Sequence, residues 1–151
     1  MMLSDIDFIK SLNLQGKTLD VGSLNVNGSI RNCCKDLYYG IDLRKGSNVD
    51  IQASSHDLPF KSEIFDNVIS IGTLEHDICF WTSIKEMKRV LKIGGRLILS
   101  VPDYKFKYHA HPKDYWRFSV DAVKLFFNNF LEITIWKSTI NDDCIRIYGI
   151  K

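Results

Sequence analysis

The chain is poor in the features that mark membrane, secreted or nucleic-acid-binding proteins. It contains no apolar run of about 18 residues, and its N-terminus carries no signal-peptide pattern. Its net charge is only +2, so composition gives no case for binding nucleic acid or a membrane surface. We therefore expect a cytoplasmic protein, and the sequence gives no indication of its oligomeric state.

Cysteine is scarce as well, and its spacing matches none of the common zinc motifs. The four cysteines are Cys33, Cys34, Cys79 and Cys144. None of them forms a C-x-x-C pair, and two adjacent thiols are poorly placed to hold one metal ion. We expect reduced, mostly buried thiols in a reducing compartment.

What remains is an ordinary globular composition, with 45% hydrophobic and 25% charged residues in a chain of 151. This length suits one domain with one core, which we place at residues 1–151. Apolar runs typical of strands cover residues 17–21, 37–43, 49–53, 65–71 and 96–101. Helical patterns cover residues 5–13, 27–34, 80–92 and 120–127, and we expect Gly94 and Gly95 to end the third helix.

The order of these segments predicts the architecture. Strands that alternate with helices indicate an α/β fold with a single Rossmann-like, doubly wound, mostly parallel sheet. Residues 131–137 and 144–150 alternate apolar and polar side chains on either side of an Asn-Asp-Asp turn. This pattern predicts a C-terminal antiparallel hairpin that completes a sheet of about seven strands.

The segment from Thr18 to Leu43 has the layout of a nucleoside-binding βαβ unit. A strand leads into Gly22, a short helix follows, and a second strand ends at Asp42, 20 residues after the glycine. Such a glycine lets the backbone approach a ligand, and the acid can accept both ribose hydroxyl hydrogens. An ordinary strand-to-helix turn and a solvated aspartate are the alternatives.

The glycine pattern bears on which nucleoside cofactor is bound. A dinucleotide calls for G-x-G-x-x-G, but Leu24 and Asn27 stand at its second and third glycine positions. Leu24 would crowd a pyrophosphate, whereas S-adenosylmethionine carries no phosphate. An NAD-dependent oxidoreductase is the less favoured alternative, because the chain also lacks a Tyr-x-x-x-Lys pair.

Three further segments carry a family resemblance. Residues 51–60 (IQASSHDLPF), 65–76 (FDNVISIGTLEH) and 88–102 (KRVLKIGGRLILSVP) occur in the order found in one enzyme family. With the strand that ends in Asp42, they resemble class I S-adenosylmethionine-dependent methyltransferases of the methyltransferase type 11 kind. The resemblance runs from about residue 18 to residue 127. It implies the same fold and S-adenosylmethionine as the cofactor.

The resemblance also implies a set of cofactor contacts. Asp20, Gly22 and Ser23 match the first motif, which cradles the methionine end, and Gly72 and Thr73 would lie near the same moiety. Asp42 matches the ribose-binding acid, and Leu43 matches the apolar residue beside the adenine. Ser54 stands where the family usually has an acid that accepts from the adenine amino group. The other implied contacts on the adenine side are Ser55, Asp57, as an alternative acceptor, and Leu58.

The connection after the fifth strand contains His109, His111 and Arg117. Long loops in compact domains are often functional, and the resemblance implies that this one lies where the methyl acceptor arrives. We assign His109 and His111 as candidate catalytic bases. Arg117 could bind an anionic acceptor or brace the loop through Asp114 or Glu75. A metal site formed by His76, His109 and His111 is an alternative, but no carboxylate or thiol is clearly placed with them, so we predict no metal site.

The implied function is methyl transfer from S-adenosylmethionine to a small-molecule or glycan acceptor that the sequence does not identify. The main alternative is a catalytically weak or inactive relative that acts as a binding or regulatory subunit. Leu24, Val26 and Ser54 favour that alternative because they depart from the usual cofactor motifs. The intact Asp20, Gly22 and Asp42 oppose it.

Overall fold

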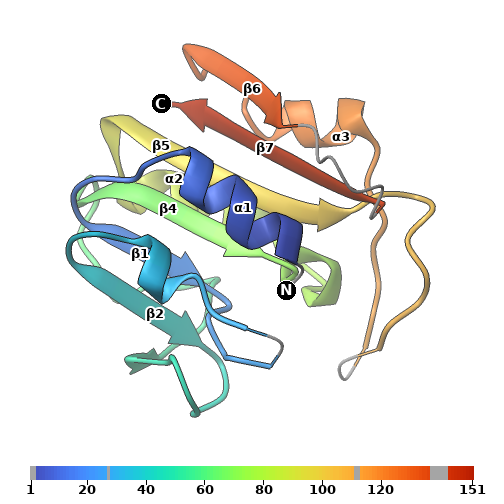
Figure 1. Ribbon diagram of the computed structural model, residues 1–151, viewed down its shortest axis with the longest axis horizontal. Coiled ribbons are helices and arrows are strands. Elements are labelled where there is room, and N and C mark those ends of the chain that lie inside the picture. The colour runs from blue at the N-terminus through green and yellow to red at the C-terminus, as the bar shows by residue number, and fades with distance from the viewer. Residues whose placement is uncertain (1–2, 27, 111–112, 137–142) are drawn as a thin grey trace.

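The computed structural model of the protein describes residues 3–26, 28–110, 113–136 and 143–151. Seven strands form one sheet in the order β3-β2-β1-β4-β5-β7-β6 (Figure 1). The strands are β1 (Thr18–Val21), β2 (Tyr38–Asp42), β3 (Ile51–Gln52), β4 (Phe65–Ile71), β5 (Leu91–Pro102), β6 (Glu132–Trp136) and β7 (Cys144–Ile150). The helices are α1 (Leu3–Ser11), α2 (Phe80–Val90) and α3 (Val120–Leu125), with 3-10 turns η1 (Arg31–Cys33) and η2 (Leu74–His76).

The pairing confirms the predicted fold class. Strands β1 to β5 pair in parallel, and β7 pairs antiparallel with both β5 and β6. The carboxyl ends of β1, β2, β4 and β5 therefore meet at one edge of the sheet. Successive strands are added on one side of β1 up to β3, and β4 is then added on its other side. Ligands of open α/β sheets bind at such a reversal of strand order, which here lies between β1 and β4.

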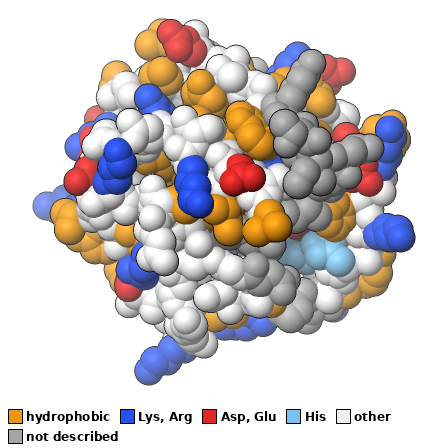
Figure 2. All heavy atoms as spheres, viewed as in Figure 1, with side chains coloured by type: hydrophobic (Ala, Val, Ile, Leu, Met, Phe, Trp, Pro, Cys, Tyr) orange, Lys and Arg blue, Asp and Glu red, His pale blue; other side chains and the backbone are white. Residues whose placement is uncertain are grey.

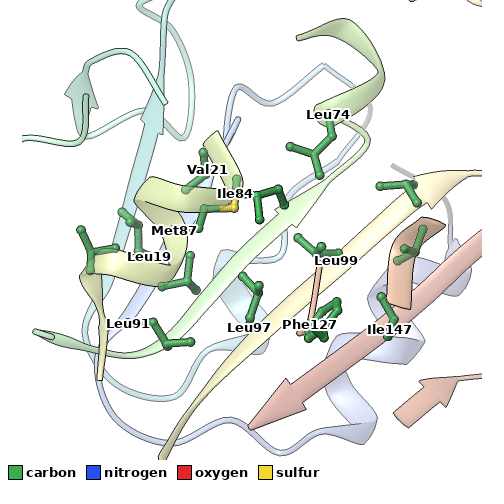
Figure 3. Close-up of a cluster of buried hydrophobic side chains, with 14 of the residues drawn as sticks. Leu19, Val21, Leu74, Ile84, Met87, Leu91, Leu97, Leu99, Phe127 and Ile147 are labelled. Carbon is green, nitrogen blue, oxygen red and sulfur yellow. The ribbon is translucent and has the colours of Figure 1, made fainter. Parts of the chain in front are cut away.

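Alternating side chains divide the apolar residues between the two faces of the sheet. Val68, Leu97 and Leu99 pack with α2 and α3, whereas Ile69 and Ile98 pack with α1 on the other face. Figure 3 shows the first cluster, where side chains of the sheet meet those of α2. The same alternation places α1 and α2 on opposite sides of the sheet in Figure 1.

A buried ion pair fixes α1 to the sheet. Arg146 of β7 is 0% exposed, and its Nε atom donates to Asp5 Oδ1 at 2.8 Å. Ser100 of β5 donates to the same Asp5 oxygen at 2.7 Å. The pair is fully hydrogen-bonded, which a buried charge requires. It also places Asp5 at the cavity described below.

Two local predictions were wrong. Residues 27–34 were expected to form a helix, but the described part contains only the single turn η1. Gly94 and Gly95 do not end α2, because the helix ends at Val90 and Leu91 already pairs with Phe65 of β4. The glycines instead form an irregularity within β5, where Gly94 has a φ of +78°.

Among the described residues, the face shown in Figure 2 carries no single-sign charged patch, because lysine and arginine side chains are spread among acidic and apolar ones. Within the described part of the chain, every helix is too short or too polar to cross a bilayer.

Candidate active site

A cavity of about 1030 Å³ opens at the carboxyl edge of the sheet. Its β1–β2 side is lined by the segments that follow β1, β2 and β3, and its β4–β5 side by those that follow β4 and β5. The volume lies at the upper end of the range of about 300–1,000 Å³ that is usual for ligand pockets. One cavity therefore runs along the edge where the sequence places both the cofactor and the acceptor.

The glycine turn after β1 is fixed by its neighbours. The N–H groups of Gly22 and Ser23 both donate to the Ile41 carbonyl at 2.9 Å. Gly22 has a φ of +84°, and a Cβ there would lie 2.1 Å from Thr73 Oγ1. Glycine is therefore required at this position by the close approach of Thr73, as well as by the left-handed backbone.

Asn48 stabilises the same turn through hydrogen bonds of its side chain. Its side-chain amide donates to the Ser23 carbonyl at 2.8 Å and to the Tyr38 hydroxyl at 2.9 Å. Its Oδ1 atom accepts from Ser29 Oγ at 2.9 Å and from Arg31 Nε at 2.8 Å. The φ of Asn48 is +73°, a conformation that asparagine tolerates better than most residues. The turn between β2 and β3 thus anchors the glycine turn after β1.

Asp20 lies beneath the loop and is only 4% exposed. Burial raises its pKa to about 7, although a hydrogen bond from the Tyr38 hydroxyl opposes the shift. Burial and the neighbouring carboxyl group together raise the pKa of Tyr38. Asp20 can therefore exchange a proton near neutral pH at the wall of the cavity.

Asp42 stands at the tip of β2 with its carboxylate at the cavity. Oδ1 accepts from the Arg44 N–H at 2.9 Å, and Oδ2 accepts from the Leu24 N–H at 3.4 Å. Leu43 follows and is 67% exposed. The Leu24 side chain leans over Gly46, where an added Cβ would lie 2.4 Å from Leu24 Cδ1. The bulky residue in the loop therefore packs against the following turn.

The segment after β3 is the one that the resemblance places beside the adenine. Ser54 Oγ accepts from the His56 N–H at 3.1 Å, and Ser83 of α2 donates to Ser55 Oγ at 2.7 Å. The His56 ring contacts Asp77 at 2.8 Å. These contacts tie the segment to the turn after β4. Both serine residues line the cavity.

On the β4–β5 side, Glu75 lies at the centre of a cluster of titratable side chains. It is 2% exposed, and burial raises its pKa to about 7. Its Oε1 atom lies 3.5 Å from His109 Nε2 and 3.8 Å from His76 Nε2. Its Oε2 atom has no hydrogen-bond partner among the described residues. Sequence reasoning treated Glu75 only as a brace for Arg117.

The long connection after β5 is held over this cluster by Arg117. Its guanidinium makes two bonds of 2.6 Å to Asp114, whose side chain is fully buried, and this pairing lowers the pKa of Asp114. It also donates to the Phe106 carbonyl at 2.9 Å. Trp116 donates to the Asp77 carbonyl at 2.8 Å and packs on Phe80. Arg117 therefore braces the loop through Asp114, one of the two roles predicted for it.

Most of the predicted site residues line the cavity, namely Asp20, Gly22, Ser23, Asp42, Leu43, Ser54, Ser55, Gly72, Thr73 and His109. Leu58 does not: it is 2% exposed and belongs to the core, because Glu86 and Arg89 hold its backbone against α2. Asp57 is exposed outside the cavity lining. His111 lies outside the described residues.

Comparison with known proteins identifies the family. The methyltransferase domain family matches residues 19–99, more than half of the chain. The chain belongs to this family. It is 30% identical, over 120 residues, to an uncharacterized protein of Methanocaldococcus jannaschii, covering 68% of this chain and 53% of that protein. It thus spans about half the length of that curated relative.

Solved structures of methyltransferases share the fold. A Thermotoga maritima S-adenosylmethionine-dependent methyltransferase, described as a possible histamine N-methyltransferase, aligns with a TM-score of 0.78 at 18% identity. The alignment covers 99% of this chain and 88% of that one. A Burkholderia thailandensis 1,6-didemethyltoxoflavin-N1-methyltransferase, solved with S-adenosylhomocysteine, aligns with a TM-score of 0.71 at 11% identity, over 97% and 77% of the two chains.

S-adenosylmethionine is the cofactor of the family, and the β1–β2 side of the cavity has the chemistry to hold it. Asp42 offers a carboxylate for the ribose hydroxyls, and Ser54 and Ser55 offer hydroxyls beside it. Asp20 offers a buried carboxyl group to the cationic methionine end. Leu24 packs against Gly46 and also lines the cavity, but S-adenosylmethionine carries no phosphate that would require a second glycine there. The donor set fits the cofactor.

Proposed function

We propose that the domain transfers the methyl group of S-adenosylmethionine to a small-molecule or glycan acceptor. One observation carries the proposal: a single cavity of about 1030 Å³ is lined both by Asp42, which we assign to the ribose, and by the polar cluster around Glu75 and His109. The β1–β2 side accounts for a cofactor, and the β4–β5 side provides polar groups for a second molecule. The family match and the shared fold support the same conclusion.

The cofactor supplies an activated methyl group as its sulfonium, so the main task of the protein is alignment. Asp42 would fix the ribose, and Asp20 would face the cationic methionine end. Gly72 leaves room at the boundary between the two sides, because a Cβ there would contact only Glu75 Oε1, at 3.6 Å, among the described atoms. His109 remains the proposed base for an acceptor that must lose a proton.

Calorimetry with S-adenosylmethionine and S-adenosylhomocysteine tests the cofactor half of this proposal. We expect Asp42→Ala to weaken binding by about 10- to 100-fold, the equivalent of one hydrogen bond to a charged group. Asp57→Ala is the matched control, because this neighbouring aspartate is exposed outside the cavity lining and its loss should leave affinity unchanged. No heat with either ligand at high protein concentration would refute cofactor binding.

A methyl-release assay against pooled metabolites and glycans tests transfer itself. Turnover with any acceptor that requires Asp42 supports an enzyme. The alternative is a weak or inactive domain that serves as a binding or regulatory subunit, and Leu24, Val26 and Ser54 favour it because they depart from the usual cofactor motifs. Cofactor binding without transfer to any pool would favour that alternative over the enzyme.

A further inference from the structure

The β4–β5 side of the cavity brings two imidazoles and a carboxylate to one point. One ligand atom each from Glu75, His76 and His109 lies within 4.8 Å of the others. Both histidine Nε2 atoms face the same oxygen, Glu75 Oε1, at 3.5 and 3.8 Å. Ligands bound to one zinc ion at about 2.0–2.2 Å lie roughly 3.4 Å apart. The three groups are therefore already close to the spacing of a shared ion.

A second observation points to a ligand at the same place. Glu75 is 2% exposed, yet its Oε2 atom has no hydrogen-bond partner among the described residues. An unpartnered carboxylate oxygen in the interior is unfavourable, and native proteins rarely leave one without a reason. Glu75 lines the cavity, so a small cation could reach it.

The outer nitrogens of the two imidazoles contact the groups that usually orient metal-binding histidines. His76 Nδ1 lies 2.6 Å from the Lys113 carbonyl oxygen, which can only accept, so the neutral ring carries its proton on Nδ1. Nε2 then bears the lone pair that faces Glu75. His109 Nδ1 lies 3.1 Å from Asp114 Oδ2, although the two atoms are not aligned as a hydrogen bond. A carbonyl and a carboxylate behind ligating imidazoles are typical of metal centres.

We propose that Glu75, His76 and His109 bind a divalent transition-metal ion at the β4–β5 side of the cavity. Two imidazoles and one carboxylate suit Zn²⁺, Co²⁺ or Fe²⁺ better than Mg²⁺ or Ca²⁺, which favour oxygen ligands throughout. Three protein ligands leave a coordination position open toward the cavity. The sequence prediction of no metal site rested on a missing carboxylate, and Glu75 provides it.

If the metal site exists, His109 is a metal ligand and not the base proposed above. The metal site does not depend on whether the protein transfers methyl groups. Metal binding is therefore measured on protein without cofactor, so that failure of the proposed function leaves this test intact. The probe is Co²⁺, titrated into EDTA-treated, dialysed protein with a non-chelating reductant. Visible absorption reports occupancy, and near-ultraviolet sulfur-to-cobalt bands report binding by thiols.

We expect one Co²⁺ per chain without sulfur bands. His76→Ala, His109→Ala and Glu75→Gln should each weaken binding by about 100-fold or more. His56→Ala is the matched control: its side chain is 38% exposed, as is that of His109, and it contacts Asp77 at 2.8 Å in the same cavity. This control should bind Co²⁺ as the wild type does.

Thermal melting of each metal-free variant establishes that it folds, and Glu75→Gln preserves the shape of the side chain if the alanine variants melt early. Absence of saturable Co²⁺ binding by the wild type would overturn the proposal. Equal binding by the wild type and all three variants would also overturn it, as would sulfur-to-cobalt bands or an equal loss in His56→Ala.

Discussion

The two sides of the cavity are held together by different chemistry. On the β1–β2 side, the neutral amide of Asn48 connects Ser23, Tyr38 and Ser29 through hydrogen bonds. On the β4–β5 side, the bonds join charged groups, above all the buried pair of Asp114 and Arg117. Both networks meet at the carboxyl edge of the same sheet.

The difference suggests a division of labour. The amide of Asn48 does not titrate, so its hydrogen bonds suit the side that we assign to the cofactor common to the family, where Asp20 is the buried group that does titrate. Buried carboxylates and imidazoles respond to protons, cations and the charge of a ligand. They suit a side whose chemistry varies with the acceptor. The predictions below alter one side at a time.

The largest effect should follow the loss of the charged brace. Arg117→Met leaves the fully buried Asp114 carboxylate without its bidentate partner. Breaking a buried ion pair by removing one member typically costs about 3–5 kcal/mol of unfolding free energy. Urea denaturation at neutral pH measures the loss. Arg31→Met is the comparison on the β1–β2 side, and it should cost only about 1–2 kcal/mol because its ion pair with Asp50 is more than one-third exposed. Equal losses would contradict the proposed contrast.

The next effect concerns Asn48. Asn48→Ala removes its side-chain hydrogen bonds and places alanine, which tolerates left-handed backbone less well than asparagine, at a φ of +73°, so we expect a loss of about 2–3 kcal/mol. Asn48→Gly keeps the backbone conformation and removes only the amide. If that variant retains full stability and full affinity for S-adenosylhomocysteine, the amide does not anchor the loop. Denaturation and calorimetry provide the two measurements.

Sequence reasoning recovered the fold because the strand signals are local. The buried strand predicted at residues 65–71 is the observed β4, and the alternation in residues 144–150 is that of β7. The helix expected at 27–34 failed since side chains there serve the network: Ser29 and Arg31 both bond to Asn48 instead of completing a regular amphipathic face. Tertiary contacts overrode local propensity.

Cavity-lining residues were predicted where a residue ends a strand or follows it directly. Asp42 is the last residue of β2, and Gly72 follows the last residue of β4. Their positions could therefore be predicted from the strand pattern. Asn48 and Glu75 were not recognised, because their partners are distant in sequence: Ser23 is 25 residues from Asn48, and His109 faces Glu75 from the connection after β5. The residues around Asn48 do not indicate that its side chain bonds to a distant loop. The Leu-Glu-His segment likewise gives little indication that Glu75 faces a distant histidine.

An effect that is spread over several pH units is expected on the β1–β2 side. The pKa of Asp20 is about 7 in the folded protein and 3.8 ordinarily, so between these values the folded state holds a proton that the unfolded state has lost. Its contribution to the unfolding free energy is fully present below about pH 4 and is lost as pH rises through 7. The slope is at most about 1.4 kcal/mol per pH unit. Urea denaturation from pH 4 to pH 8 measures the unfolding free energy of the wild type and of Asp20→Asn. The difference between the two values should change with pH at this slope.

Glu75→Gln provides the comparison on the other side, because burial also raises the pKa of Glu75 to about 7. With EDTA present, the unfolding free energy of Asp20→Asn and of Glu75→Gln should each fall less with rising pH than that of the wild type. A difference between wild type and Asp20→Asn that stays constant with pH would show that Asp20 is ionised throughout this range. A cationic cofactor favours the ionised carboxylate, so S-adenosylmethionine should also bind more tightly above pH 7 than below it.

The smallest effect is expected at the boundary between the two sides. Gly72 has a φ of +59°, but a Cβ there would meet only Glu75 Oε1, at 3.6 Å, among the described atoms. Gly72→Ala should therefore lose only the backbone term, about 1–2 kcal/mol. Gly22→Ala has the same left-handed backbone and in addition places a Cβ 2.1 Å from Thr73 Oγ1, so its loss should be clearly larger. Thr73→Ala, which removes the obstructing hydroxyl, should recover part of the Gly22→Ala loss and none of the Gly72→Ala loss. If it recovers both or neither, the space above Gly22 is not limited by Thr73, and the two sides of the cavity do not meet through that contact.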